Sequence, residues 1–284
     1  MCPRTPPNFL AAPVAYHATQ PNDEKHGPTT PCGRSNASSQ PHTASRGGLI
    51  RFVSQADGKT YYGLADQHLR EAETLSAGHP FGSDARPTGV RQPISQLLSP
   101  LARDDCRGIV CIGLNYRDHA EEAKMAIPTV IVIGKEASRV SEAQALDYVY
   151  GYTVGNDFSN RTWQLDKTLS GGQWCFSKSF DASAPIGPAI VSKEALGDAA
   201  NLSIRANLNG ETMQDSNTGQ MIFGAAKLVS FLSQAMTLLP GTLIFTGTPA
   251  GVGLGRSPQV VVKEGDVTLR TPCSAPPLFG TLKI

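Results

Sequence analysis

IVCIGLNYRDHAEEAKMAIPTVIVIGK, from Ile109 to Lys135, is the stretch that decides the fold. It begins and ends with short apolar runs, Ile109–Ile112 and Val130–Ile133, each followed by glycine, which is typical of buried strands. A charged segment with His119 and Glu122 runs almost directly into the second apolar run, which leaves no room for further structure between them. The sequence therefore predicts two buried strands separated only by a polar segment.

Composition limits the classes of protein to consider. The chain has 284 residues, 40% of them hydrophobic, which is enough for a large domain with a small one beside it. It has 25 basic and 24 acidic side chains without a Lys/Arg run, so we expect neither nucleic acid nor membrane as a partner. The apolar stretch 221–239 is interrupted by Lys227 and several polar residues, which favours an amphipathic helix over a membrane span. A small molecule is the expected partner.

The first 46 residues predict a disordered leader, because they are rich in Pro, Thr, Ser and Asn and poor in large apolar side chains. They lack a long apolar core for a secretory signal, and Asp23 and Glu24 argue against a transit peptide. The six cysteines show no C-x-x-C and no paired zinc spacing, so we expect free thiols in a reducing compartment. Together these features predict a cytoplasmic rather than a mitochondrial protein.

Residues 47–105 are expected to form a small N-terminal β-domain and a linker. Two β-type segments, LIRFVSQ and TYYGLA, flank Asp57-Gly58, a dipeptide that favours a tight hairpin turn. The range from Asp66 to Asp105 mixes polar residues with Pro and Gly, so we expect it to be the linker. Residues 106–284 form the main domain in this interpretation.

Within the main domain, local signals predict more strands than helices. Ser141 and Gln144 have capping-box spacing and predict a short helix that ends near Val149. Alternating apolar residues lead into Asn209-Gly210, which predicts a hairpin. Apolar residues recur at helical spacing from Met221 until Pro240-Gly241, which should end the helix. The fold class is therefore α+β, mostly β.

Five blocks resemble the fumarylacetoacetate hydrolase family, in the family's order, between about Gly48 and Ile284. They are IVCIGLNYRDHAEEAK, GYTVGNDFSNRTWQ, SKSFDASAPIGP, NGETMQDSNTGQMIF and TGTPAGVG. The resemblance implies a mixed β-sheet and β-roll fold with a small N-terminal β-domain. It also implies metal-dependent cleavage or isomerisation of acylpyruvates, β-diketones or oxaloacetate-like acids. Compared with the family, the chain is shortened near 128–131, where a Glu-x-Glu pair that holds metal is missing.

The resemblance assigns His119 as the general base and Glu122 as its orienting partner. The two residues are three apart, which places them on one face if the segment is helical. A base of this kind needs a pKa near the working pH and a fixed tautomer. A neighbouring carboxylate fixes the tautomer by accepting a hydrogen bond from the imidazole. Without the resemblance, a histidine in a charged patch is more often simply solvated.

Asp157 follows an apolar strand and matches a metal-coordinating carboxylate of the family. Taken alone, an aspartate after a strand is more often a turn former. Mg²⁺ is usually held by one or two carboxylates together with substrate oxygens and water. We therefore expect Mg²⁺, Mn²⁺ or Ca²⁺ to bind weakly, because two of the family's glutamate ligands are missing.

Arg161 and Gln164 match substrate-binding positions, Lys178 matches a lysine that faces developing negative charge, and Thr248 matches a position near the substrate carboxylate. Positive groups in these places are chemically reasonable, because cleavage of a carbon–carbon bond passes through an oxyanion and an enolate. The glycines around Thr248 do not make a nucleotide site, since the chain has no G-x-G-x-x-G that opens a helix.

The sequence leaves three hypotheses open. The first is a divalent-metal-dependent hydrolase, lyase or tautomerase that acts on a 2-oxo acid, acylpyruvate or β-diketone and forms the family's homodimer. The second is a catalytically inactive member that acts as a binding or dimerisation subunit. The third is a truncated gene product, because removing strands from a sheet leaves unpaired edges.

Overall fold

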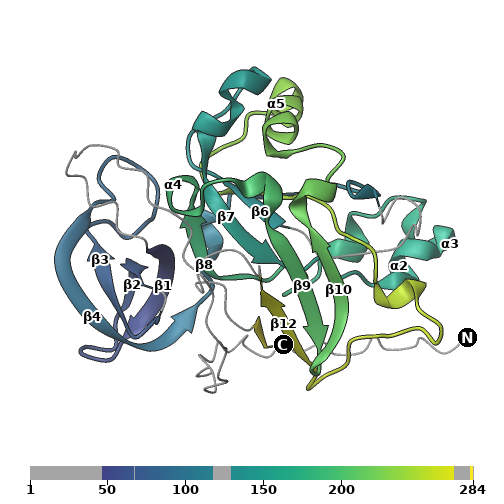
Figure 1. Cartoon of the computed structure of the whole chain (residues 1–284), viewed down its shortest axis with the longest axis horizontal. Coiled ribbons are helices and arrows are strands. Elements are labelled where there is room, and N and C mark those ends of the chain that lie inside the picture. The colour runs from purple at the N-terminus through teal and green to yellow at the C-terminus, as the bar shows by residue number, and fades with distance from the viewer. Residues whose placement is uncertain (1–46, 67, 118–128, 272–281, 284) are drawn as a thin grey trace, which may run out of the picture.

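A computed structural model describes residues 47–66, 68–117, 129–271 and 282–283. It consists of a nine-stranded sheet, in the order β2-β3-β4-β1-β8-β7-β6-β11-β5, and a four-stranded sheet in the order β10-β9-β12-β13. Short helices lie around these sheets (Figure 1). The predicted class, α+β and mostly β, is confirmed.

The strands are β1 (Gly48–Ser54), β2 (Thr60–Ala65), β3 (Glu71–Leu75), β4 (Pro87–Leu98), β5 (Gly108–Cys111), β6 (Thr129–Ile133), β7 (Val149–Gly155), β8 (Ile186–Ser192), β9 (Ser203–Leu208), β10 (Glu211–Asn217), β11 (Thr242–Phe245), β12 (Val267–Thr271) and β13 (Leu282–Lys283). The α-helices are α2 (Arg161–Leu165), α3 (Lys167–Ser170), α4 (Lys193–Leu196) and α5 (Ala225–Ala235). The 3₁₀ helices are η1 (Arg103–Asp105), η2 (Glu142–Tyr148), η3 (Phe176–Lys178), η4 (Ala199–Asn201), η5 (Thr218–Gln220) and η6 (Gly253–Gly255).

The first four strands form a unit at the left of Figure 1. The hairpin predicted around Asp57-Gly58 is confirmed, since β1 and β2 pair in antiparallel register and Gly58 takes the left-handed φ of +71° that the turn requires. The range that we expected to be a linker instead contains β3 and β4, which complete this unit. Most residues of β4 are exposed, so the apolar alternation that would have revealed a strand is absent.

The N-terminal unit continues into the main sheet, because β1 pairs with β8 as well as with β2 and β4. The predicted strand at Val130–Ile133 is confirmed as β6, whose five residues are all buried between β7 and β11. The first predicted strand is only partly correct. β5 is a strand, but among the described residues it pairs only with β11 at the edge of the sheet, and Ile109 is 47% exposed.

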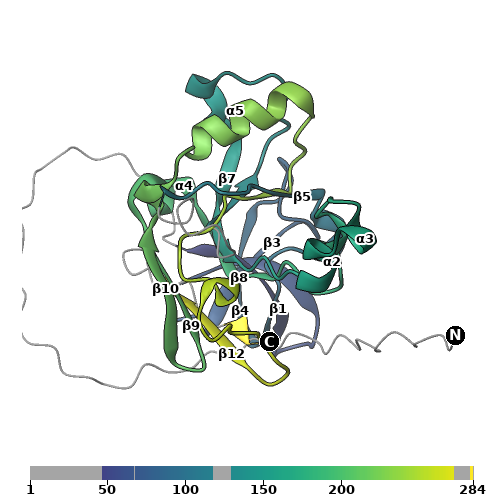
Figure 2. The ribbon, with the colours of Figure 1, turned by 90° about the vertical axis from the view of Figure 1, so that its right-hand side faces the viewer.

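The hairpin predicted at Asn209-Gly210 is also confirmed. Leu208 of β9 pairs with Glu211 of β10, and both turn residues have positive φ, as this turn type requires. Figure 2 shows β9, β10 and β12 together on one flank of the molecule. The small sheet therefore stands apart from the large one and presents β10 toward the glycine-rich loop after β11.

Two helix predictions need correction. The capping-box segment forms the 3₁₀ helix η2, and Ser141 donates its hydroxyl to the side chain of Gln144 instead of capping a backbone N–H. The helix expected to begin near Met221 begins only at Ala225 and ends at Ala235. Within the described part of the chain, no helix is long and apolar enough to cross a membrane. The predicted leader, residues 1–46, lies outside the described residues.

Candidate active site

A cavity of about 1210 Å³ gathers five of the seven site residues that the sequence predicts. Its lining includes Asp157, Arg161, Gln164, Lys178 and Thr248, which come from the ends of β7 and β11 and from α2 and η3. These positions span 91 residues of sequence (248 − 157 = 91), so only the folded chain brings them together. His119 and Glu122 lie outside the described residues, and their assigned roles remain predictions.

Asp157 and Lys178 form the charged centre of this cavity. The Nζ atom of Lys178 lies 2.6 Å from Oδ2 of Asp157 and donates a second hydrogen bond of 2.8 Å to Ser159 Oγ. Both charged side chains are only 18% exposed, so water screens the pair less than it screens a surface pair. The lysine ammonium is thus fixed beside the predicted metal ligand.

The loop that carries Asp157 is held by backbone hydrogen bonds on both sides. The N–H of Asn156 donates to the carbonyl of Pro185 at 3.0 Å, and the N–H of Phe158 donates to the carbonyl of Ser183 at 2.9 Å. Because these bonds continue the path of β7 beyond its last residue, the carboxylate has a defined position at the strand end.

Arg161 and Gln164 lie one turn apart on α2. The side chain of Asn160 accepts a hydrogen bond from Trp163 N and so caps the helix. Arg161 donates to the side-chain oxygen of Gln164, which is buried. Burial lowers the pKa of Arg161 to about 10, and the negative charge of Asp157 opposes that shift. Arg161 therefore remains a cation at neutral pH, available to an anionic ligand.

Thr248 lies in the glycine-rich loop after β11, and a residue of another strand, Gln214 of β10, holds it in place. Gln214 of β10 donates to Thr248 Oγ1 at 3.1 Å and to the carbonyl oxygen of Pro249 at 2.7 Å. Gly251 has a φ of +99°, and an added Cβ would overlap the carbonyl oxygen of Met213. Only glycine allows this close approach, so the small sheet sets the position of the loop.

Sequence reasoning missed Asn115 as a residue that supports the site. Its amide group donates to the carbonyl oxygens of Phe223 and Thr246 at 2.9 and 2.8 Å, and its Oδ1 accepts from the N–H of Phe223 at 2.8 Å. Asn115 is 1% exposed. It therefore ties three distant segments together beside the cavity, and its place in the NYRDH block was the only local signal.

Three cysteines lie in the described part of the chain, and Cys106, Cys111 and Cys175 are free thiols there. Cys111 and Cys175 line the cavity. Cys111 remains open to solvent, yet desolvation by the surrounding atoms raises its pKa to about 11, and the charge of Asp157 adds to that rise. Cys111 is therefore a neutral thiol at physiological pH.

The donor set does not make a preformed metal site in the described residues. No three His, Cys, Asp or Glu side chains of this part of the chain gather closely enough to hold an ion. Asp157 is already paired with Lys178, and among the described residues the other carboxylate that lines the cavity is Asp181. A divalent ion at Asp157 would compete with the lysine, so the described residues do not fit a metal ion by themselves.

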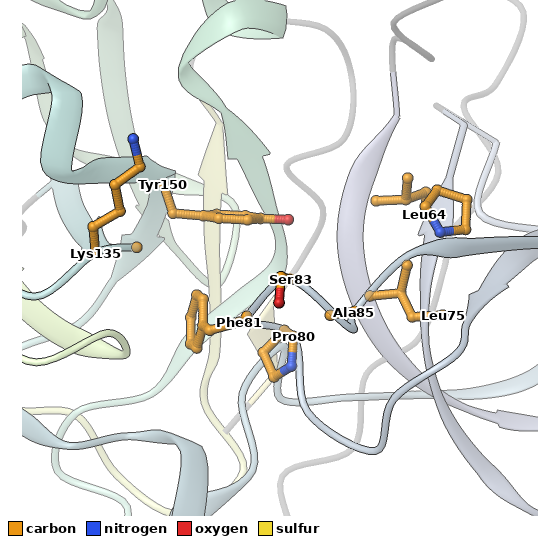
Figure 3. Close-up of a pocket in the computed structure, with 11 residues that line it drawn as sticks. Leu64, Leu75, Pro80, Phe81, Ser83, Ala85, Lys135 and Tyr150 are labelled. Carbon is orange, nitrogen blue, oxygen red and sulfur yellow. The ribbon is translucent and has the colours of Figure 1, made fainter.

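A second pocket, of about 450 Å³, lies between the N-terminal unit and the main sheet. Figure 3 shows Tyr150 above Phe81 and Ser83, with its hydroxyl end directed toward the side of the pocket that Leu64 lines. The lining is mostly apolar and contains neither a carboxylate nor a histidine. It lacks the carboxylates and the group of several cations that line the larger cavity, so the larger cavity is the candidate active site.

Comparison with known proteins identifies the family. Residues 129–274 match the family model described as "Fumarylacetoacetate (FAA) hydrolase C-terminal". The chain is 46% identical over 202 residues to the Fumarylacetoacetate hydrolase domain-containing protein 2 homolog of Dictyostelium discoideum, with 56% of this chain and 66% of that protein covered. It is 33% identical over 259 residues to the mitochondrial oxaloacetate tautomerase FAHD2A of Homo sapiens, with coverage of 79% and 80%.

A solved structure has a similar fold. The 2-hydroxyhepta-2,4-diene-1,7-dioate isomerase from Mycobacterium marinum superposes with a TM-score of 0.65 and 31% identity, over 83% of this chain and 96% of that one. The fold thus places the chain in the class of fumarylacetoacetate hydrolase-type proteins. The chain belongs to the fumarylacetoacetate hydrolase family.

The matches cover 66% of the Dictyostelium protein and 63% of the Xenopus laevis protein, so this chain spans just under two thirds of those relatives. Relatives from Xenopus laevis, Bos taurus and Homo sapiens are named as mitochondrial. These names contradict the predicted cytoplasmic location. That prediction used Asp23 and Glu24 as an argument against a transit peptide, and two acidic residues are weak evidence.

Proposed function

We propose that the chain is a tautomerase of 2-oxo acids, with oxaloacetate as the first substrate to test. The observation that carries the proposal is the gathering of Arg161 and Lys178 with Asp157 in one cavity. The names of several relatives, oxaloacetate tautomerase, favour this reaction among those that the family performs. The same relatives support a mitochondrial location for this chain.

Tautomerisation of a 2-oxo acid places negative charge on the carbonyl oxygen, and the site must stabilise this charge. Enolisation removes a proton from C3 of the acid; the electron pair forms the C2–C3 double bond, and the carbonyl oxygen becomes an enolate before it is protonated. Fixed positive groups lower the barrier because they stabilise the charge that develops on this oxygen. Lys178 is suited to face the enolate oxygen, since its hydrogen bonds to Asp157 and Ser159 hold its ammonium in place.

Arg161 is suited to bind the carboxylate of the acid. A guanidinium has a planar fork of donors that matches a carboxylate. Its hydrogen bond to Gln164 orients this fork, and its pKa of about 10 keeps it charged through the physiological range. Thr248, fixed by Gln214, is the proposed second contact to the same carboxylate.

The remaining roles rest on the family resemblance. His119 is the proposed base that moves the proton at C3, with Glu122 as its orienting partner. A divalent ion remains a proposal, and it would supply Lewis-acid polarisation of the carbonyl when bound. The poor donor set described above favours binding only together with substrate oxygens, and a homodimer likewise remains a proposal.

The decay of enolic oxaloacetate, followed through its ultraviolet absorbance, tests this function. Lys178→Gln should lower the catalysed rate about 10²- to 10³-fold, because it removes a fixed donor from the developing charge. Lys263→Gln, a change of an exposed lysine that does not line the cavity, should leave the rate unchanged. Equal loss in both variants, or no catalysis by the wild type, would contradict the proposal.

A further inference from the structure

The pocket of about 450 Å³ between the N-terminal unit and the main sheet takes no part in the proposed function. Its volume lies within the range of about 300–1,000 Å³ that is usual for small-molecule sites. One wall comes from β2, from β3 and from the loop 76–86 that joins β3 to β4. The other wall comes from β7 and from the two residues that follow β6. A ligand in this pocket would therefore contact both units of the fold.

The loop 76–86 is closed by hydrogen bonds at its base. The N–H of Ser76 donates to the carbonyl of Arg86 at 2.8 Å, and the N–H of Arg86 donates to Oγ of Ser76 at 3.0 Å. Nε of Arg86 also donates to the carbonyl of Ser83 at 2.8 Å. These bonds give the loop a defined path, so Phe81 and Ser83 have defined positions in the pocket wall.

Tyr150 is the main side chain of the opposite wall. Its ring makes a T-shaped contact with the ring of Phe81, with centroids 5.5 Å apart and an angle of 86° between the planes. Gly134 packs against the start of this side chain, since an added Cβ there would lie 2.7 Å from Cβ of Tyr150. Burial raises the pKa of Tyr150 to about 12, and the negative charge of Glu194 adds to the rise. The hydroxyl therefore stays protonated at physiological pH and can donate a hydrogen bond.

Three polar side chains of the pocket have donors to offer. Among the residues that the structure describes, the side chains of Ser83, Lys135 and Tyr150 have neither a hydrogen-bond partner nor an ion-pair partner. Lys135 is the only charged residue of the described chain that lines the pocket. An acceptor group with a negative charge would satisfy these donors, whereas a cation would be repelled by Lys135.

The rest of the lining is apolar. Figure 3 shows Leu64 and Leu75 on the opposite side of the pocket from Lys135 and the ring of Tyr150. The other apolar residues of the lining are Pro80, Phe81, Ala85 and Pro87. Apolar surface of a ligand that covers these side chains would leave water, which favours binding. The pocket therefore suits a ligand that has one polar group and an apolar body.

We propose that this pocket binds a small monocarboxylate with an aromatic or branched apolar tail. Tyr150 and Ser83 donate hydrogen bonds to the carboxylate, Lys135 supplies the opposite charge, and the tail packs against Leu64 and Leu75. The proposal goes beyond the proposed function and does not depend on it, because none of these residues lines the candidate active site.

Calorimetric titration with 3-phenylpropanoate and with its neutral amide, 3-phenylpropanamide, tests the site. The two compounds have the same shape and differ in charge, so the wild type should bind the acid about 5-fold more tightly than the amide. Tyr150→Phe, which keeps the ring, should weaken binding of the acid about 5-fold, as expected for one hydrogen bond. Lys135→Gln should weaken it about 3-fold, the effect of an exposed charge. The control Lys263→Gln, a change of an exposed lysine outside the pocket, should bind as the wild type does.

Lys178→Gln separates this pocket from the larger cavity, because Lys178 lines only the larger one. Its affinity for 3-phenylpropanoate should equal that of the wild type. Loss of binding in Lys178→Gln, with none in Tyr150→Phe, would place the acid in the candidate active site and overturn the proposal. Equal affinities of the wild type for the acid and the amide, or binding of neither, would also overturn it.

Discussion

At the scale of single residues, the site depends on charges held in place before any ligand arrives. Lys178 contacts both Asp157 and Ser159, so its ammonium has little freedom to follow a substrate. Such preorganisation lowers the cost of reorganisation during the reaction and accounts for much of the catalytic effect of fixed donors. The same arrangement has a consequence for metal ions, because the lysine occupies one oxygen of the only carboxylate that the family resemblance assigns as a ligand here.

We therefore predict that Mg²⁺ binds weakly to the protein alone and more tightly when oxalate, which mimics the enolate of a 2-oxo acid, supplies two further oxygens. Calorimetric titration with Mg²⁺, with and without oxalate, measures this. Asp157→Asn should remove the oxalate-dependent binding. Tight binding without oxalate that is indifferent to Asp157→Asn would reveal a metal site elsewhere in the chain.

Cys111 should react slowly with alkylating reagents despite its open position. Its pKa is raised to about 11, so at pH 8 only about one thiol in a thousand is the reactive thiolate. Labelling with iodoacetamide, followed by peptide mapping, should therefore show a rate that rises about tenfold per pH unit between pH 7 and pH 10. A rate that levels off below pH 9 would contradict the raised pKa.

Local motifs pointed to residues that the structure brings to one cavity, while the roles assigned to these residues stay predictions. Asp157, Arg161, Gln164, Lys178 and Thr248 lie together as expected. Supporting residues were missed because their roles exist only in three dimensions. Asn115 bonds to groups 108 and 131 residues away, and Gln214 bonds across 34 residues to Thr248, so the motifs in which they lie do not reveal these contacts.

At the scale of elements, pairing of distant backbone segments decides where strands and helices end. The apolar spacing that predicts a helix from Met221 is real, but Met221 forms a β-bridge with Tyr116, and Asn115 binds the backbone of Phe223. Leu238 likewise pairs with Ala137 beyond the other end of α5. Both contacts hold extended backbone, so the helix is limited to Ala225–Ala235.

The close packing of β7 against β8 makes Gly151 irreplaceable, although its φ is ordinary. A Cβ at this position would overlap the carbonyl oxygen of Val191, which belongs to the ladder itself. Gly151→Ala should lower the free energy of unfolding by about 2 kcal/mol or more, as overpacking against backbone cannot relax by a rotamer change. Urea denaturation measures the loss.

The matched control is Gly108→Ala on β5, where an added Cβ meets nothing within 4 Å. This variant should unfold within about 0.5 kcal/mol of the wild type, as surface changes usually do. Equal destabilisation by both substitutions would show that the close approach at Gly151 is not the cause.

At the scale of the whole molecule, the N-terminal unit and the main sheet share structure. β1 pairs with β8, and one apolar cluster combines Ile50, Phe52 and Ala72 with Val154 and Val191. Arg51 and Arg103 extend the shared region into the candidate active site. The expected family fold was therefore readable from the ordered motifs, whereas the continuity of the two units was not, because it depends on the pairing of β1 with β8, which are far apart in the sequence.

Since the two units share a core, we predict a single cooperative unfolding transition for a chain that begins at Gly47. Its midpoint should lie within about 2 °C of that of the full chain, because residues 1–46 lack the apolar content to add a core. Far-ultraviolet circular dichroism and tryptophan fluorescence should give coincident curves. Two separate transitions, or a clearly lower midpoint, would contradict the prediction.

The central claim is that the cavity around Asp157, Arg161 and Lys178 binds the anion of a 2-oxo acid. Calorimetric titration with oxalate of the wild type, Lys178→Gln and the exposed control Lys263→Gln measures this most directly. We predict that the wild type and Lys263→Gln bind oxalate with the same affinity, and that Lys178→Gln binds about 10-fold more weakly, since it loses one charge-assisted contact. The same affinity in all three proteins, or no binding in any of them, would contradict the claim.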